Sequence, residues 1–150
     1  MPVLLLALIV FLSDQISKLL VRQWLQPNQS VPVLNNIFHL TYINNPGAAF
    51  GIFAYQTPLF IILTLAVIGI IIIAYKQFPI HNRLNLKLAL ALQLGGALGN
   101  LLDRIRFGYV VDFLDFRVWP VFNLADVAIV LGVGLIIWEL WRKEEKGEAQ

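Results

Sequence analysis

The stretch TPLFIILTLAVIGIIIIAY, residues 57–75, decides the fold, because it runs for 19 residues without a charged side chain. As a helix it would be about 28 Å long at 1.5 Å per residue, close to the thickness of a bilayer's hydrocarbon core. Aspartate, glutamate, lysine and arginine are absent over the whole of residues 23–75. We therefore predict a membrane helix here.

The composition of the whole chain agrees with a bilayer environment. Of its 150 residues, 59% are hydrophobic and 13% are charged, which is too apolar for a soluble protein of one domain. The sequence has no cysteine, so disulfides, thiolate catalysis and thiolate metal sites are excluded. The net charge of +2 gives no reason to expect a nucleic-acid partner.

Hydropathy predicts three further spans around this stretch, at about residues 2–22, 86–104 and 124–141. The first lacks a basic start and a small-residue cleavage site, so we interpret it as a retained helix and not a cleaved signal peptide. Small residues at four-residue spacing, Gly95/Gly99 and Ala128/Gly132, are expected to let the third and fourth spans approach closely. The prediction is one all-α integral membrane domain over residues 1–150, a bundle of four transmembrane helices.

The segment of about residues 27–55, between the first two spans, has the pattern of a small β-sheet. IFHLTYI (37–43) is rich in β-branched and aromatic residues, NNPG (44–47) is a turn signal, and AAFGIF (48–53) is a second short run. We expect a small antiparallel sheet at the membrane surface, where its aromatic side chains suit the headgroup layer.

The charges give the predicted orientation. The basic loop at 76–87 and the tail WRKEEK (141–146) contain no aspartate, so we assign both, and both termini, to the cytoplasm. In this topology every aspartate lies in the outer half and every glutamate at the inner end. The acidic groups of the outer half are Asp14, Asp103, Asp112, Asp115 and Asp126.

The sequence excludes several kinds of catalytic site. His39 and His81, the two histidines, would lie on opposite sides of the membrane, and there is no H-E-x-x-H zinc motif. No phosphate-binding G-x-x-x-x-G-K-[ST] loop or G-x-S-x-G elbow is present, although His39 with an outer serine stays formally open. We expect no metal and no cofactor, and what remains is carboxylate chemistry.

Among the aspartates, Asp112 is the hardest to explain structurally. It lies in VVDFLDF (110–116), which we predict to be an apolar loop, with no basic residue close in sequence. Asp126 has a good structural explanation, because Asn123 can cap the fourth helix and Asp126 suits its first turn. Asp14 could pair with Lys18 on one helix face.

We nevertheless pair Asp112 with Asp126 as candidate catalytic groups. A loop that returns to the head of a helix can bring them together, and two close carboxyl groups share one proton because both cannot ionise. One could then act as general base on a water molecule and the other as general acid. Asn100 and Arg104 form a polar stripe on the third span, with Gly96 and Gln93 below them, which must face the bundle or a wet cavity.

At these residues the sequence resembles the bacterial lipoprotein signal peptidases, the type II signal peptidases. The resemblance covers nearly the whole chain, and its motifs are DQISK (14–18), NNPGAAF (44–50), GNLLDR (99–104), GYVVDF (108–113) and FNLAD (122–126). It implies a protease of the bacterial inner membrane with a β-cradle outside. Such an enzyme cleaves diacylglyceryl-modified prolipoproteins just before the lipidated cysteine and uses no metal or organic cofactor.

Carried over by position, the resemblance implies that Asp112 and Asp126 are the catalytic dyad. It implies that Asn45, Asn100, Arg104 and Asn123 orient the substrate and the dyad, and that Asp103 braces Arg104. Asp14, Lys18 and Gly47 would support the site. No catalytic role is implied for Asp115. The expected partners are the prolipoproteins and membrane lipid, and nothing in the sequence demands more than a monomer.

Two other functions are compatible with parts of this pattern. A membrane lipid-processing enzyme could use Arg104 and Asp103 around a phosphate, and would need Arg104 most. A non-enzymatic carrier could line a path with Asp14 and Lys18, and would depend little on Asp112.

Overall fold

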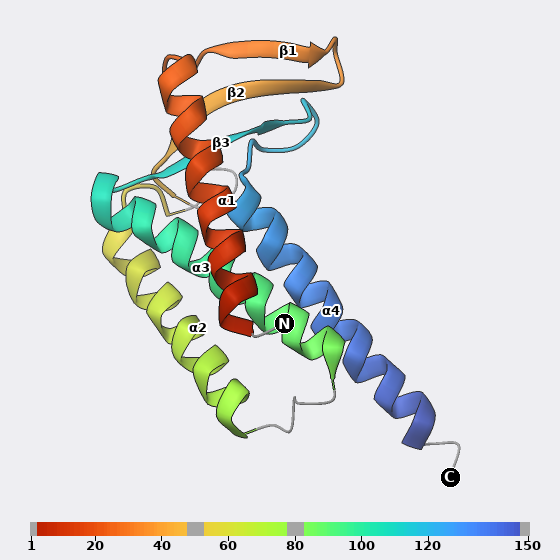
Figure 1. Ribbon diagram of the computed structural model, residues 1–150. Coiled ribbons are helices and arrows are strands. Elements are labelled where there is room, and N and C mark those ends of the chain that lie inside the picture. The colour runs from red at the N-terminus through yellow and green to blue at the C-terminus, as the bar shows by residue number, and fades with distance from the viewer. Residues whose placement is uncertain (1–2, 48–52, 78–82, 148–150) are drawn as a thin grey trace.

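The computed structural model describes residues 3–47, 53–77 and 83–147, with side chains through Arg142. Its helices and strands follow one another in a simple order (Figure 1). They are α1 (Val3–Trp24), β1 (Ser30–Leu34), β2 (Phe38–Asn45), α2 (Thr57–Gln77), α3 (Leu84–Phe107), β3 (Val110–Asp115) and α4 (Leu124–Gly147). The sheet lies at the end of the bundle where α1 ends and α4 begins (Figure 1).

Three of the described helices are long and apolar enough to cross a membrane, namely Val3–Trp24, Thr57–Gln77 and Leu124–Arg142. They expose large apolar side chains, such as Leu4 (71%), Ile62 (64%) and Val130 (69%), as expected for a protein whose solvent is lipid. α3, over the predicted third span, is less apolar because it carries Gln93, Asn100 and several charges. The fold is therefore mostly helical, with three candidate membrane spans and a small sheet.

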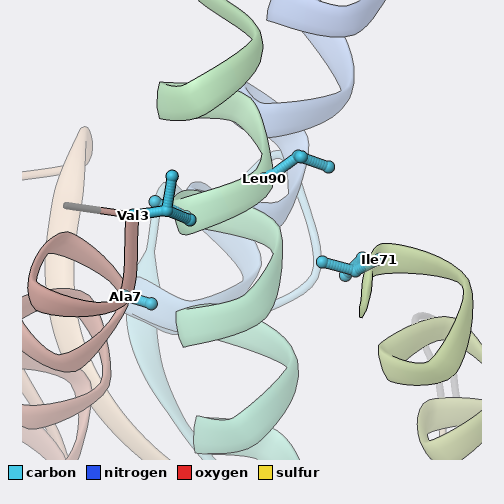
Figure 2. Close-up of a cluster of buried hydrophobic side chains, with 5 residues drawn as sticks. Val3, Ala7, Ile71 and Leu90 are labelled. Atoms are coloured by element: carbon cyan, nitrogen blue, oxygen red, sulfur yellow. The ribbon is translucent and has the colours of Figure 1, made fainter. Parts of the chain in front are cut away.

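α3 is the centre of the bundle and packs against α1, α2 and α4. At the end of the bundle away from the sheet, an apolar cluster holds three helices together (Figure 2); it is formed by Val3 and Ala7 of α1, Ile71 of α2, and Leu90 and Ala91 of α3. α2 reaches the bundle through α3, and Ile71 is its buried side chain.

The glycines of α3 allow close packing, but not all in the predicted direction. A Cβ on Gly95 would lie 2.6 Å from the carbonyl oxygen of Ala7, so this glycine faces α1 and not the fourth span. Gly99 likewise faces Asp14 of α1, while Gly96 meets Ala125 of α4 at 2.5 Å. The prediction was wrong for Gly95, because α3 is packed on both sides and four-residue spacing does not say which neighbour a face meets. Gly99 also meets Ala125 of α4 at 3.5 Å, and Gly132 of α4 meets Ala89 of α3 at 3.0 Å, as predicted for the third and fourth spans.

The sheet has three antiparallel strands in the order β1-β2-β3. The expected strand at IFHLTYI is present as β2, whereas residues 48–52 of the second predicted run lie outside the described residues. The third strand is β3, the segment we predicted to be a loop. Ile43 pairs with Asp112 and Asn45 with Val110, so β3 is held by a partner strand far away in the sequence.

A tight turn sets the position of β3. α3 ends at Gly108, which adopts the left-handed conformation (φ 79°) and donates its N–H to the carbonyl of Arg104. β3 starts two residues later, at Val110. The turn therefore directs Asp112 from the end of α3 back over the bundle.

Candidate active site

Asp112 lies in the middle of β3 with 2% of its surface exposed. Two asparagine amides bind its carboxyl group. Asn45 Nδ2 of β2 donates to Oδ2 at 2.8 Å, and Asn123 Nδ2 donates to Oδ1 at 2.6 Å. Both partners are neutral, so the group is hydrogen-bonded without being neutralised by a cation.

Asp126 takes part in the predicted helix cap at the start of α4. Its backbone N–H donates to Asn123 Oδ1 at 3.0 Å, and the N–H of Asn123 donates to Asp126 Oδ2 at 3.3 Å. This reciprocal pair is a capping box, which satisfies otherwise free donors of a helix start. The other oxygen, Oδ1, accepts from Asn100 Nδ2 at 2.8 Å. A cap therefore fixes this carboxylate beside α3.

Asn123 joins the two aspartates. It is completely buried, its Nδ2 reaches Asp112 and also lies 3.2 Å from Asn100 Oδ1, and its Oδ1 and backbone bind Asp126. The structure thus brings together the two carboxyl groups that we paired from the sequence.

The surroundings of Asp112 favour its protonated form. Burial, and then the neighbouring charge of Asp126, raise the pKa of Asp112 to about 7, although the hydrogen bonds from Asn45 and Asn123 oppose the rise. A carboxyl group with this pKa exchanges a proton near neutral pH, as a general acid or base must.

A second carboxyl cluster is linked to this pair through Asn100, and one lysine is ion-paired with both of its carboxylates. Lys18 Nζ lies 2.8 Å from Asp14 Oδ2 and 2.9 Å from Asp103 Oδ2, with all three side chains almost fully buried. Lys18 also donates to Asn100 Oδ1 at 3.0 Å. We call Asp14, Lys18 and Asp103 the ion cluster.

The ion cluster also binds backbone groups of the elements that carry the aspartate pair. Asp14 Oδ1 accepts the N–H of Ala125, in the first turn of α4, at 3.0 Å. Asp103 Oδ2 accepts the N–H of Val111, next to Asp112, at 3.1 Å. The supporting role predicted for this cluster therefore has a direct geometric basis.

Arg104 differs from its prediction. We expected Asp103 to brace it, but the Asp103 carboxylate binds Lys18, Gln15 and the backbone of Val111. The Arg104 guanidinium instead lies over the ring of Phe60 on α2, 4.9 Å from its centre. Consecutive residues of a helix point in different directions, so Asp103 points toward α1 while Arg104 points toward α2. Arg104 is still close enough to Asp126, Asp112 and Asp103 to interact with their charges.

Two further residues support the site, and one was missed. Gly47 donates its N–H to Asn45 Oδ1 at 3.0 Å, which turns the Asn45 amide nitrogen toward Asp112. Gln15 had no predicted role, yet its Nε2 lies 3.1 Å from both Asp14 Oδ2 and Asp103 Oδ1. The available signal was an amide beside Asp14 in an otherwise apolar span.

Asp115, the second aspartate of VVDFLDF, belongs to a separate set of contacts on the sheet. It accepts from Thr41 Oγ1 at 2.7 Å and pairs with Arg117 at 3.0 Å. Burial raises the pKa of Asp115, but these hydrogen bonds outweigh it and hold the pKa below its usual value. This residue therefore stays ionised and gives no indication of catalysis.

A groove runs along α3 and includes Asn100, whose amide binds Asp126. It encloses about 250 Å³ between α2, α3 and α4. Its lining includes Asn100, Arg104 and Gln93 of α3, so the polar stripe predicted on the third span faces a cavity. Within the described residues, no group of three or more histidine, aspartate or glutamate side chains could hold a metal ion.

The fold and the site define a class of protein: a helical membrane protein with a pair of linked aspartates, one buried and one half-buried, near one end of its bundle. The comparisons with known proteins identify the family within that class. Residues 6–142 match the family model described as signal peptidase (SPase) II. The chain belongs to this family, and it is therefore a peptidase.

The similarity to individual members extends over nearly the full length. The lipoprotein signal peptidase of Moorella thermoacetica is 59% identical over 93% of this chain and 93% of its own length. That of Halothermothrix orenii is 49% identical over 97% of this chain and 99% of its own. A solved structure described as a bacterial membrane enzyme superposes with a TM-score of 0.90 at 30% identity, covering 96% of this chain and 90% of that one.

Proposed function

We propose that this chain is an intramembrane aspartyl endopeptidase that removes the signal peptide from diacylglyceryl-modified prolipoproteins, cutting before the lipidated cysteine. The family membership supports the reaction, and the relatives from Moorella thermoacetica and Halothermothrix orenii are named for it. The observation that carries the mechanism is the linkage of Asp112 to Asp126 through Asn123.

In the proposed mechanism the two carboxyl groups share one proton. The ionised carboxylate removes a proton from a water molecule as the water oxygen attacks the peptide carbonyl carbon, and the protonated partner donates its proton to the carbonyl oxygen. The tetrahedral intermediate then breaks at the C–N bond: the leaving amine takes a proton from the protonated carboxyl group, and a hydroxyl of the intermediate gives its proton to the other carboxylate, which restores the shared proton of the dyad. The raised pKa of Asp112, about 7, supports a shared proton at neutral pH.

We assign the neighbouring polar side chains the role of positioning the two aspartates. Asn45 and Asn123 hold Asp112, and Asn100 holds Asp126. Arg104 is close enough to counter negative charge that develops on the substrate. No metal or organic cofactor is needed, because water is the nucleophile.

We further propose that the enzyme crosses the bacterial inner membrane four times, with α3 as an additional span and both termini in the cytoplasm. The aspartate pair then lies near the outer surface, where a lipidated substrate has one end in lipid and the other in water. Glu139, at the opposite end of the bundle, binds Asn85 at 3.4 Å and Arg142 at 3.5 Å, consistent with an inner end rich in basic residues. A monomer with bound lipid is sufficient for this reaction.

The test compares wild type with Asp112→Asn, Asp126→Asn and Asp115→Asn in lipid micelles. Each protein is incubated with a diacylglyceryl-modified prolipoprotein and with its unlipidated form. We expect wild type to cleave the lipidated form, and each dyad variant to lose about 10²- to 10⁴-fold in rate, which is the typical contribution of a general acid or base.

Asp115→Asn is the matched control, since it removes a buried carboxylate from the same strand without touching the dyad. It should cleave at close to the wild-type rate. Near-normal cleavage by a folded Asp112→Asn or Asp126→Asn variant would contradict the mechanism, and cleavage of the unlipidated form at an equal rate would contradict the substrate.

A further inference from the structure

Gln93 is an amide without a partner in the apolar part of the bundle. It lies in the middle of α3 with 9% of its surface exposed, and it makes no hydrogen bond to any residue that the structure describes. Its side chain lines the groove that also contains Asn100 and Arg104. Where there is no water, an unsatisfied amide is costly. The fully buried side-chain atoms without a partner, among the described residues, do not include the Gln93 amide, so this amide opens into the groove and is available to a group from outside the protein.

The groove is shaped to hold Gln93 in this position. A Cβ on Gly132 of α4 would lie 2.8 Å from Gln93 Cγ, so the absence of a side chain there makes room for the glutamine stem. Phe60 and Thr64 of α2 line the same groove. The Thr64 hydroxyl is already used, because it donates to the carbonyl of Phe60 at 2.7 Å. Gln93 is thus held by a close contact while its amide stays available.

The distance along α3 between Gln93 and the aspartate pair determines which part of a bound substrate Gln93 can reach. It lies seven residues before Asn100, which is two helical turns on the same face and about 10 Å along the axis. Asn100 binds Asp126 directly. An extended peptide rises about 3.3 Å per residue, so about three residues of substrate would span the interval between the dyad and Gln93.

The proposed substrate has a matching unsatisfied group at that depth. A signal peptide enters with its N-terminus toward the cytoplasm, so the C-terminal end of its apolar helix points toward the dyad. The last four carbonyls of a helix have no partner within the helix. Near the cut the chain must leave the helix so that water can reach the scissile carbonyl, and the freed carbonyls then lie in lipid below the dyad.

We propose that Gln93 donates its side-chain amide to a backbone carbonyl at the C-terminal end of the signal-peptide helix, where the chain becomes extended toward the dyad. Gln93 is then a specificity-determining residue that recognises the point at which the helix ends. This proposal rests on the proposed function. Its effect is on substrate binding, because the contact forms about 10 Å from the reacting bond and is the same before and during the chemical step.

The test replaces Gln93 by methionine, which keeps the length and shape of the stem against Gly132, and separately by leucine. Leu94→Met is the control, because the adjacent side chain lines a different cavity between α1 and α3. Two lipidated substrates are compared: a full-length prolipoprotein, and a blocked lipopeptide that begins two residues before the lipidated cysteine. The short substrate lacks the carbonyl that would reach Gln93.

For the full-length substrate we expect KM to rise by about 5- to 30-fold in both Gln93 variants with kcat unchanged, the effect of losing one or two kcal/mol of binding. The short substrate should be cleaved equally well by wild type, both variants and the control. An unchanged KM for the full-length substrate, or an equal rise for both substrates, would overturn the proposal. Failure of the wild-type protein to cleave either substrate would instead overturn the proposed function, and this inference with it.

Discussion

Two carboxyl clusters lie side by side in this protein, and they differ in how their charge is balanced. In the ion cluster, Asp14 and Asp103 are each within 3 Å of Lys18 Nζ. In the dyad, Asp112 and Asp126 are held by asparagine amides, and the structure records no ion pair for either among the described residues. The same residue type is thus paired with a cation in one cluster and held by neutral amides in the other.

Asn100 connects the two clusters. Its Oδ1 accepts from Lys18, and this fixes its Nδ2 toward Asp126. The ion cluster therefore orients the Asn100 amide, which binds Asp126 of the dyad. It also holds α1, α3 and the start of α4 together. This difference agrees with the division of roles that we propose, in which the carboxylates paired with Lys18 support the fold and the pair without a cation performs the chemistry.

Removing the cation should have the largest effect on stability. Lys18→Met would leave Asp14 and Asp103 buried without a counter-ion, and breaking a buried pair in this way costs about 3–5 kcal/mol. We expect a clear loss of stability toward denaturant in detergent micelles, and loss of cleavage as Asn100 is released.

The control is a triple variant that combines Lys18→Met with Asp14→Asn and Asp103→Asn. It removes all three charges together. Recovery of a large part of the lost stability is the expected result. If the triple variant is as unstable as Lys18→Met alone, the charge balance of the ion cluster is not what stabilises the fold.

A smaller effect is expected from crowding the ion cluster without changing its charge. In Gly99→Ala the new Cβ would lie 2.5 Å from Asp14 Oδ2, which must move away from its partners. Overpacking of this kind costs about 1–3 kcal/mol. Thermal unfolding in micelles would measure the loss.

Gly134→Ala is the matched control on α4, because a Cβ there meets nothing within 4 Å. It should leave stability unchanged or raise it by about 0.4–1 kcal/mol. Equal stabilities for the two alanine variants would mean that Asp14 has more freedom than its contacts indicate.

Much of this architecture could be predicted from the sequence, because the hydropathy of a segment directly indicates whether it can lie in lipid. The uncharged run at 57–75 became α2, and the strand at 37–43 became β2. The proximity of Asp112 and Asp126 was also predicted, because a segment that returns to the head of a helix can bring them together, and Asn123 hydrogen-bonds to both.

What could not be predicted depends on contacts between distant segments. Residues 110–115 were predicted to be a loop, because a short apolar run does not reveal that β2 provides a partner strand. The directions of Gly95 and Gly99 and the neighbours of Asp103 and Arg104 depend on how α3 is rotated among its neighbours. Helical spacing defines faces without saying what each face meets.

The central claim is that Asp112 exchanges a proton near neutral pH, and infrared spectroscopy can measure this directly. The carbonyl-stretch band of protonated carboxylic acids is followed against pH in micelles for wild type and Asp112→Asn. We predict a band in wild type that is present in acid and disappears as the pH rises through about 7, and that Asp112→Asn lacks. A wild-type spectrum with no such band above pH ~5, or a band that persists in Asp112→Asn, would contradict the account.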